Sequence, residues 1–375
     1  MEQQQKILLV QLFSNGDCLY ATAIARQIKK DYPGCHLTWA IAGFCKSIIV
    51  NNPYVDEIME VNSVAKKDIA AFRKFKKEVA EKKSKRQLDL VFITQSMDTN
   101  EALYDGCIRS AIFRTYPNPI TVPVQPVLKL SETEIENARL FSIQYNLSNY
   151  KQVILFEFAP LSGQSAITKE IAVKIAEELC ENKDIAIILS SGNKIQHANR
   201  NIIDGSVLSL RETAALTHYC SMLLGCSSGI TWISTSDAAK QLPMIQIINP
   251  ETYWVNSVSR DFKRFGIDTN ALIELTHLNE TELVNCIKEA LVNFSSARAK
   301  YNQEISVHFK ATRKIVYNLL CYFEFGAILN HIKINREVYG NNLSFFKEVF
   351  IGFITSPFKL IKNIIAKKIL RGKNV

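Results

Sequence analysis

The chain has 375 residues, of which 47% are hydrophobic, and it carries a formal net charge of +9. This length is enough for two domains of ordinary size, each with its own hydrophobic core. The nine cysteines include no Cys-x-x-Cys pair and the six histidines include no His-x-x-x-His pattern, which argues against a disulfide framework or a structural zinc site and favours a reducing cytoplasm.

The first part of the chain alternates predicted strands with predicted helices. The predicted strands are the short apolar runs 6–13, 36–42, 55–61 and 89–95, and the predicted helices are 18–31 and 66–83. Such an alternation is typical of a parallel sheet that carries helices on both faces.

A proline-spaced run at 116–126 and a polar helix at 131–145 interrupt this pattern, which then starts again. The later predicted elements are strands at 151–158, 185–191, 221–226 and 243–249, and helices at 168–182 and from about Ser209. We place the domain boundary near 145–150, so that residues 1–148 form an N-terminal domain and residues 149–325 a C-terminal one. Two doubly wound domains in series place a ligand site between the carboxyl edges of the two sheets.

The remaining residues, 326–375, are predicted to form a basic amphipathic helical tail. Its segment 344–370 is apolar but too often interrupted by lysine to span a bilayer. Two interpretations stay open. The segment is either an interfacial helix whose lysines meet anionic lipid, or a helix that packs on the protein and exposes its lysines.

The positive charge is concentrated in two segments. Residues 66–86 hold ten Lys/Arg against three acids, and residues 343–375 hold seven against one. A charge run such as 66–86 is usually the solvated face of a helix. Its pairing with an apolar and basic tail favours contact with an anionic membrane surface instead.

The first strand is followed by the turn Ser14-Asn15-Gly16-Asp17. Gly16 permits a close approach of the backbone, and the N–H groups that open the next helix create a positive end. An aspartate in this position most often caps the helix. Taken alone, the turn does not separate a helix cap from a catalytic carboxylate.

Residues 7–61 resemble the opening of family 9 glycosyltransferases, the heptosyltransferase group. The matching pieces, in order, are Ser14-Asn15-Gly16-Asp17, Tyr32-Pro33 and Asn52-Pro53-Tyr54-Val55-Asp56. The resemblance implies a GT-B architecture, in which two Rossmann-like domains face a central cleft. It also implies that Asp17 is the general base, with Ser14, Asn15 and Gly16 in the loop on the acceptor side.

An inverting sugar transfer needs such a base on the face opposite the departing nucleotide, while the leaving diphosphate needs positive charge or N–H donors. No Asp-x-Asp motif occurs in the chain, so we expect a metal-independent mechanism without a cofactor and with the nucleotide-sugar as co-substrate.

Two loops of the second domain are candidates for the donor side. The first is the loop Ser162-Gly163-Gln164-Ser165, which precedes a predicted helix. A Ser/Gly loop in this position can hold an anion, although it can also be an ordinary strand–helix connection. Residues 209–247 resemble the C-terminal signature of the same family, with Ser227 in place of its aspartate and Trp232 in place of its histidine. The candidate donor-binding residues are Ser162, Gly163, Gln164, Ser165, Ser209, Arg211, Ser227, Ser228 and Gly229.

These departures leave the donor open. Ser227, Ser228 and the Gly229 N–H can still bind phosphate as neutral donors, but the leaving group is less well stabilised unless Arg211 or Lys194 compensates. Trp232 has two interpretations, because an aromatic residue here is more often part of a core than a platform for a sugar.

The leading hypothesis is a bacterial glycosyltransferase that acts on a surface glycan or lipid-linked saccharide, as in lipopolysaccharide or capsule biosynthesis. We expect it in the cytoplasm, peripheral on the inner membrane face through residues 66–86 and 344–373. Two alternatives stay open: a sugar-nucleotide epimerase, and an inactive saccharide-binding or scaffolding subunit. No nucleic-acid partner is expected, because the aromatic residues near 72–75 form no stacking motif.

Overall fold

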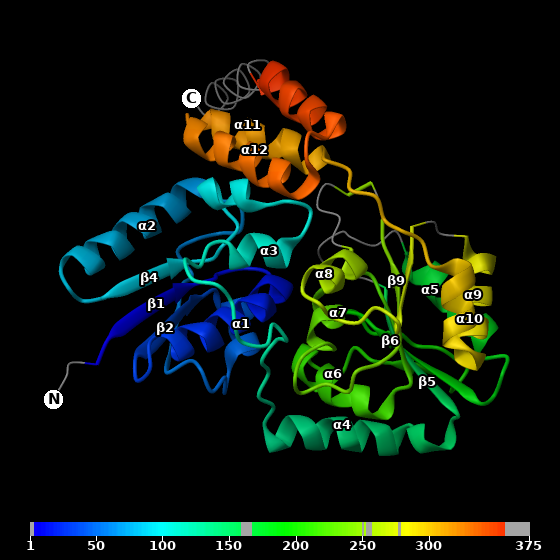
Figure 1. The fold of residues 1–375 in the computed structure, drawn as a ribbon. Helices are drawn as coiled ribbons and strands as arrows, with labels where there is room; N and C mark the ends of the chain where they lie inside the picture. Colours follow the sequence, from blue (N-terminus) through cyan, green and yellow to red (C-terminus); the bar gives the residue numbers. More distant parts are fainter. Residues whose placement is uncertain (1–3, 159–166, 250, 253–256, 277–278, 357–375) are drawn as a thin grey trace, which may run out of the picture.

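The computed structural model describes residues 4–158, 167–249, 251–252, 257–276 and 279–356. They form two α/β domains, each built on a parallel sheet, and a group of helices near the C-terminus (Figure 1). The fold class predicted from the alternation of strands and helices is confirmed.

The first sheet has the strand order β3-β2-β1-β4, and all neighbours are parallel. Its strands are β1 (Lys6–Val10), β2 (His36–Ile41), β3 (Glu57–Glu60) and β4 (Leu90–Ile93). Successive residues of a strand point to opposite faces. Ile7 and Leu9 therefore share a core with α1 (Asn15–Asp31), whereas Leu8 and Val10 share one with α2 (Ile69–Ser84).

The second sheet has the order β10-β9-β8-β5-β6-β7, again parallel throughout. Its strands are β5 (Gln152–Glu157), β6 (Ile185–Ser190), β7 (Ile202–Asp204), β8 (Met222–Gly225), β9 (Met244–Ile247) and β10 (Leu272–Leu275). The helices over one face are α5 (Lys169–Leu179), α9 (Glu280–Val292) and α10 (Phe294–Tyr301). Those over the other face are α6 (Leu210–Leu216), α7 (Gly229–Ile233) and α8 (Val258–Arg264).

One hydrophobic core runs from the α1 side of the first sheet to the α6–α8 side of the second. At its centre Tyr20 of α1 packs on Trp232 of α7, with ring centroids 4.8 Å apart and both side chains buried. The two domains thus meet helix against helix (Figure 1). Burial of this apolar surface holds them together.

The connection between the domains is also helical. It contains α3 (Ile108–Phe113) and α4 (Glu132–Gln144). The described residues also form short 3-10 helices in several places along the chain, which are η1 (Gly43–Ile49), η2 (Asp98–Leu103), η3 (Leu147–Asn149) and η4 (Thr217–Tyr219). Ser131 and Glu134 form a capping box at the start of α4, which satisfies backbone donors that the helix leaves open.

After the second domain the chain returns to the first. The helices α11 (Lys310–Cys321), α12 (Phe325–Tyr339) and residues 343–356 pack around a separate core. The buried imidazole of His331 donates to the carbonyl of Ala102 in η2, 2.9 Å away. Within the described ranges, every helix is too short or too polar to cross a bilayer.

Most predicted elements are found, with shifted ends. The predicted helix 66–83 begins at Ile69, because the carboxylate of Asp68 caps it by accepting from the N–H of Ala71. The short edge strands β7 and β10 and the helix α3 are not evident in the sequence pattern. The predicted tail helix exists over 343–356, and its remainder lies outside the described residues.

Candidate active site at the domain junction

Asp17 lies in the first turn of α1, because the helix begins three residues before the predicted start at residue 18. The helix starts at Asn15, and Ser14 occupies the cap position with a left-handed backbone (φ 68°) and no side-chain cap hydrogen bond. Asp17 is therefore a first-turn residue, where the helix dipole favours a negative charge.

The surroundings of Asp17 disfavour its ionised form. The side chain is only partly exposed, and this loss of hydration raises the pKa of Asp17 to about 7, although the nearby Lys66 ammonium acts in the opposite direction. A carboxylate that titrates near neutral pH can both accept a proton and release it, which suits a general base.

The turn that carries Asp17 lies against the second domain. A Cβ atom added to Gly16 would be 3.2 Å from Cδ1 of Trp232, and one added to Gly229 would be 3.6 Å from Cβ of Asn15. The predicted acceptor-side loop, Ser14, Asn15 and Gly16, is thus brought together with Gly229. Glycine at position 16 lets α7 approach α1 this closely.

Trp232 is 2% exposed and belongs to the core between the domains, so of its two interpretations the core is the one found. The guanidinium of Arg109 lies 5.5 Å from its ring and 4.7 Å from the ring of Tyr20. Arg109 pairs with Asp261 of α8 at 3.0 Å, both side chains being buried. A buried ion pair flanked by aromatic rings therefore occupies the centre of the junction.

A second carboxylate with a raised pKa lies on the other side of the junction. Glu157, at the end of β5, is 5% exposed. Burial raises its pKa to about 7, while the Ser228 hydroxyl and the N–H groups of Ile230 and Thr231 stabilise the charge. Glu157 thus lies where α7 begins. Sequence reasoning missed it, although a glutamate that ends an apolar strand is an unusual residue there.

The serines of the second signature are engaged within the protein. The Ser228 hydroxyl donates to the Glu157 carboxylate. The Ser227 N–H donates to Oε1 of Gln246 at 2.8 Å, and Ser227 has a left-handed backbone (φ 55°). Both side chains are buried, so neither hydroxyl is open to a phosphate in this conformation.

Ser209 and Arg211 have local partners as well. Ser209 caps α6 by accepting from the N–H of Glu212 at 3.2 Å. Arg211 pairs with Glu134 at 2.5 Å and donates to the carbonyl of Lys129, which holds α4 on α6 and lowers the pKa of Glu134 to about 2. The roles in donor binding stay predictions for Ser209, Arg211, Ser227, Ser228 and Gly229. Residues 162–165 lie outside the described residues.

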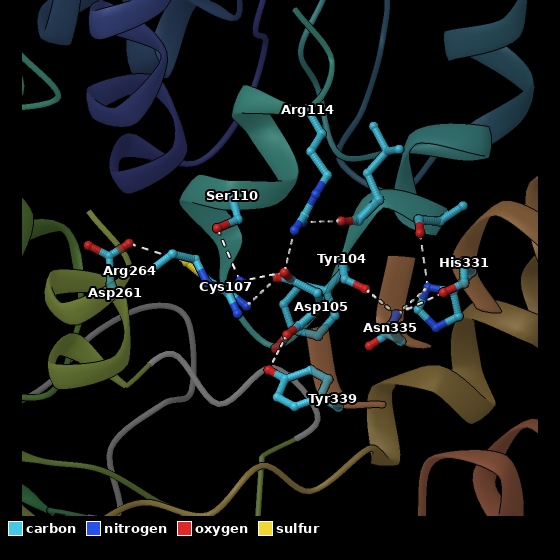
Figure 2. Close-up of polar contacts among 12 residues, drawn as sticks. Tyr104, Asp105, Cys107, Ser110, Arg114, Asp261, Arg264, His331, Asn335 and Tyr339 are labelled. Carbon is cyan, nitrogen blue, oxygen red and sulfur yellow. Dashed lines mark hydrogen bonds and ion pairs between the residues drawn. The ribbon is translucent and has the colours of Figure 1, made fainter. Parts of the chain in front are cut away.

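A network of polar groups around Asp105 joins the first domain to α8 and to α12 (Figure 2). The buried Asp105 carboxylate accepts from Arg114 at 2.6 Å and from Arg264 of α8. The Tyr339 hydroxyl of α12 donates to the Asp105 carbonyl at 2.5 Å. One residue of the first domain is thereby tied to α8 and to the C-terminal helices.

A polar pocket of about 340 Å³ lies beside β10 and α8. Arg260, Lys263 and Glu274 are among the residues that line it. Arg260 donates to the carbonyl of Ile305 at 2.6 Å, and the Glu274 carboxylate accepts from the Ser257 hydroxyl at 2.8 Å. Lys263 pairs at 4.0 Å with Glu304, which also lines the pocket.

In the part of the chain that the structure describes, no group of three or more His, Cys, Asp or Glu side chains is placed to hold a metal ion.

Comparison with known proteins supports the fold. No protein-family model and no curated protein sequence matches the chain. Among solved structures, a family 9 glycosyl transferase from Veillonella parvula DSM 2008 superposes with a TM-score of 0.53, at 15% identity over 79% of this chain and 94% of that one. The E. coli ADP-heptose LPS heptosyltransferase II gives 0.51, at 14% identity over 77% and 99%. The two-domain fold is thus the one that the sequence resemblance implies.

Proposed function

We propose that the protein is a glycosyltransferase that moves a sugar from a nucleotide-sugar to a saccharide acceptor with inversion, and that Asp17 is its general base. The observation that carries the proposal is a carboxylate with a pKa near 7 in the first turn of α1, in the same turn as Gly16, which packs on Trp232 of α7. Two structures with which the chain superposes are named as a family 9 glycosyl transferase and as an ADP-heptose LPS heptosyltransferase.

The chemistry follows from this position. Asp17 accepts the proton of an acceptor hydroxyl as that oxygen forms its bond to the anomeric carbon. The bond from the anomeric carbon to the diphosphate breaks on the opposite face, and the electron pair leaves with the nucleotide. Because attack and departure occur on opposite faces, the configuration inverts. The lack of an Asp-x-Asp motif favours a mechanism in which protein groups, without a metal, receive the diphosphate charge.

The donor is a nucleotide-sugar whose base and sugar stay open. One superposed structure is named for ADP-heptose, but the second signature of this chain differs at Ser227 and Trp232. Glu157 adds a specific constraint, since its carboxylate stands before the first N–H groups of α7. A diphosphate that uses those groups must meet Glu157 protonated or displaced, because two anions repel each other at close range.

The acceptor we propose is a bacterial surface glycan or lipid-linked saccharide, as in lipopolysaccharide or capsule synthesis. The protein would then work at the inner face of an anionic membrane, through residues 66–86 and 344–373. The part 357–373 lies outside the described residues.

The engagement of Glu157 with Ser228 also favours a second candidate, a saccharide-binding or scaffolding subunit that has kept the fold without turnover. A thermal-shift panel of ADP-, GDP-, UDP- and CMP-linked sugars, followed by a hydrolysis assay of any donor that binds, separates the two. A donor that binds the native state raises its melting temperature. Binding with slow hydrolysis supports the transferase, binding without hydrolysis or transfer supports the second candidate, and no shift with any donor contradicts the proposed function.

A further inference from the structure

Large apolar side chains that are exposed to solvent gather on the C-terminal helices. The most exposed are Leu343 at 84%, Phe323 at 79% and Leu329 at 67%. Single exposed apolar residues are ordinary, whereas a group of them marks a binding surface. We call this group the aromatic ridge; its members are Tyr322, Phe323, Phe325, Leu329, Phe350, Phe353 and Ile354.

The packing of the three helices brings the ridge together. Arg313 of α11 pairs with Glu348 at 2.8 Å, and a Cβ added to Gly352 would be 2.9 Å from Val316. Contacts thus advance in the same direction along α11 and along 343–356, so the two helices run parallel. The end of 343–356 therefore lies near the turn between α11 and α12, which carries Phe323 (Figure 1).

Helix 343–356 has two apolar faces, which a helix packed only on the protein does not need. Phe345 and Val349 are buried in the core with α11. Phe350, Phe353 and Ile354 point to solvent. The second face implies contact with another apolar phase or partner.

The basic helix α2 adjoins the ridge. The Arg73 guanidinium lies 4.2 Å from the centre of the Tyr322 ring and pairs with Glu324 at 2.7 Å. Beyond Arg73, α2 exposes Lys74, Lys77, Lys82 and Lys83 against Glu78 and Glu81. An apolar ridge is thus continuous with a cationic helix.

We propose that the aromatic ridge and α2 together form a docking surface for an anionic lipid bilayer. Aromatic and aliphatic side chains enter the boundary between headgroups and acyl chains, and the lysines of α2 meet the lipid phosphates. The charge of α2 is what favours an anionic bilayer over a second copy of this chain, which would bring two cationic helices together. The proposal rests on the proposed function, for which a lipid-linked acceptor requires a membrane.

An open pocket of about 500 Å³ lies on the inner side of the ridge, between η2 and the start of α12. Thr99, Asn100 and Asn330 line it together with Phe323 and Phe325. The two phenylalanines therefore border open space on this side.

Flotation of the full-length protein with vesicles tests the docking surface. The protein should bind vesicles that contain phosphatidylglycerol and bind pure phosphatidylcholine more weakly. The double variant Phe323→Ser/Phe325→Ser should bind the anionic vesicles about tenfold more weakly or worse. The matched control is Val292→Ser, which removes an 89% exposed apolar side chain from α9. Equal binding of the double variant and the parent, or an equal loss in the control, would overturn the proposal.

Charge is tested separately by Lys74→Glu/Lys77→Glu. This variant should lose binding to anionic vesicles while its weak binding to phosphatidylcholine stays the same. Unchanged binding to anionic vesicles contradicts the role of α2. Thermal melting of each variant without lipid shows that the fold is retained.

Direct contact is tested with Phe323→Trp. Its added fluorescence should be quenched by lipids with brominated acyl chains and, without vesicles, by acrylamide in water. Protection from acrylamide without vesicles means that another segment or another copy covers the ridge, and overturns the proposal. A dimer that Phe323→Ser/Phe325→Ser dissociates, measured by light scattering, does the same.

The donor panel keeps the two proposals apart, because soluble nucleotide-sugars do not need the ridge. Vesicle binding without donor binding contradicts only the proposed function. Donor binding with intact vesicle binding in the ridge variant contradicts only the docking surface.

Discussion

The two turns that meet at the domain junction each contain a serine with positive φ, but their side chains differ. Ser14 before α1 and Ser227 before α7 are both left-handed, with φ of 68° and 55°. Each turn has a carboxylate with a pKa near 7, Asp17 in the first and Glu157 in the second. Asp17 comes from the helix that the turn opens and stays partly exposed, whereas Glu157 comes from a neighbouring strand and is buried.

The difference in exposure between Asp17 and Glu157 indicates that the two carboxylates have separate roles. A carboxylate that solvent and ligands can reach is able to exchange a proton during a reaction. A buried carboxylate that accepts from Ser228 instead satisfies donors at the start of α7, where the proposed function would place the diphosphate. The predictions below test whether this division of tasks is real.

The largest effect is expected for Asp17→Asn. Sugar transfer should fall by about 10²–10⁴-fold, because the amide cannot accept the proton from the acceptor hydroxyl. Initial rates with a donor found in the thermal-shift panel measure this, with Glu57→Gln on β3 as the control for loss of a carboxylate. A transfer rate within a few-fold of the parent would mean that another group is the base.

The substitution Arg109→Met should destabilise the junction between the two domains. Asp261 would then be buried without its cation, which costs about 3–5 kcal/mol of unfolding free energy. Urea unfolding measures the loss. The double variant Arg109→Met/Asp261→Leu should regain much of it, since no lone charge is left. A single variant as stable as the parent would show that the ion pair does not hold the two turns together.

The raised pKa values of Asp17 and Glu157 predict that the stability of the protein depends on pH. Both pKa values are near 7 in the folded protein and near 4 when the chain is unfolded, so the folded state holds more protons between these values. The free energy of unfolding should therefore fall as pH rises from about 4 to 7, by at most about 1.4 kcal/mol per pH unit for each group.

Chemical denaturation across this pH range measures the slope. Asp17→Asn and Glu157→Gln should each flatten it, and Glu178→Gln, which changes a partly exposed carboxylate paired with Lys288, should not. A slope that neither variant changes would place the titration in other groups.

A smaller effect is expected for donor binding by Glu157→Gln. Removing the charge in front of α7 should tighten the binding of nucleoside diphosphates about tenfold at neutral pH, because repulsion between two nearby anions disappears. Calorimetric titration of the variant, with Glu178→Gln as control, checks this. Weaker or unchanged binding would show that the diphosphate does not approach the start of α7.

The local pattern of the sequence is enough to predict the two parallel sheets and the turn that carries Asp17, although α1 begins three residues earlier than predicted. Strands such as 151–158 are short apolar runs with turn residues on either side, and this signal depends only on near neighbours in the chain. The likeness of residues 7–61 to a known family adds the expectation of two facing domains, which the superposed structures support.

Other features depend on residues that are far apart in sequence. Glu157 meets Ser228 across 71 positions, and Arg211 meets Glu134 across 77. No local pattern indicates such pairs, because partners are chosen by packing of the whole chain. The left-handed backbone at Ser14 and Ser227 is equally invisible in composition, since serine rarely adopts it without tertiary support.

The sequence by itself determined most elements of this protein, the order in which they alternate and the turn that carries Asp17, because periodicity and turn chemistry act over a few residues. Only the tertiary structure decided that Glu157 faces α7, that Trp232 belongs to a shared core, and that the C-terminal helices return to the first domain and expose the aromatic ridge. The reason is physical: burial raises a pKa, pairs a charge or leaves an apolar face uncovered only after distant segments have packed.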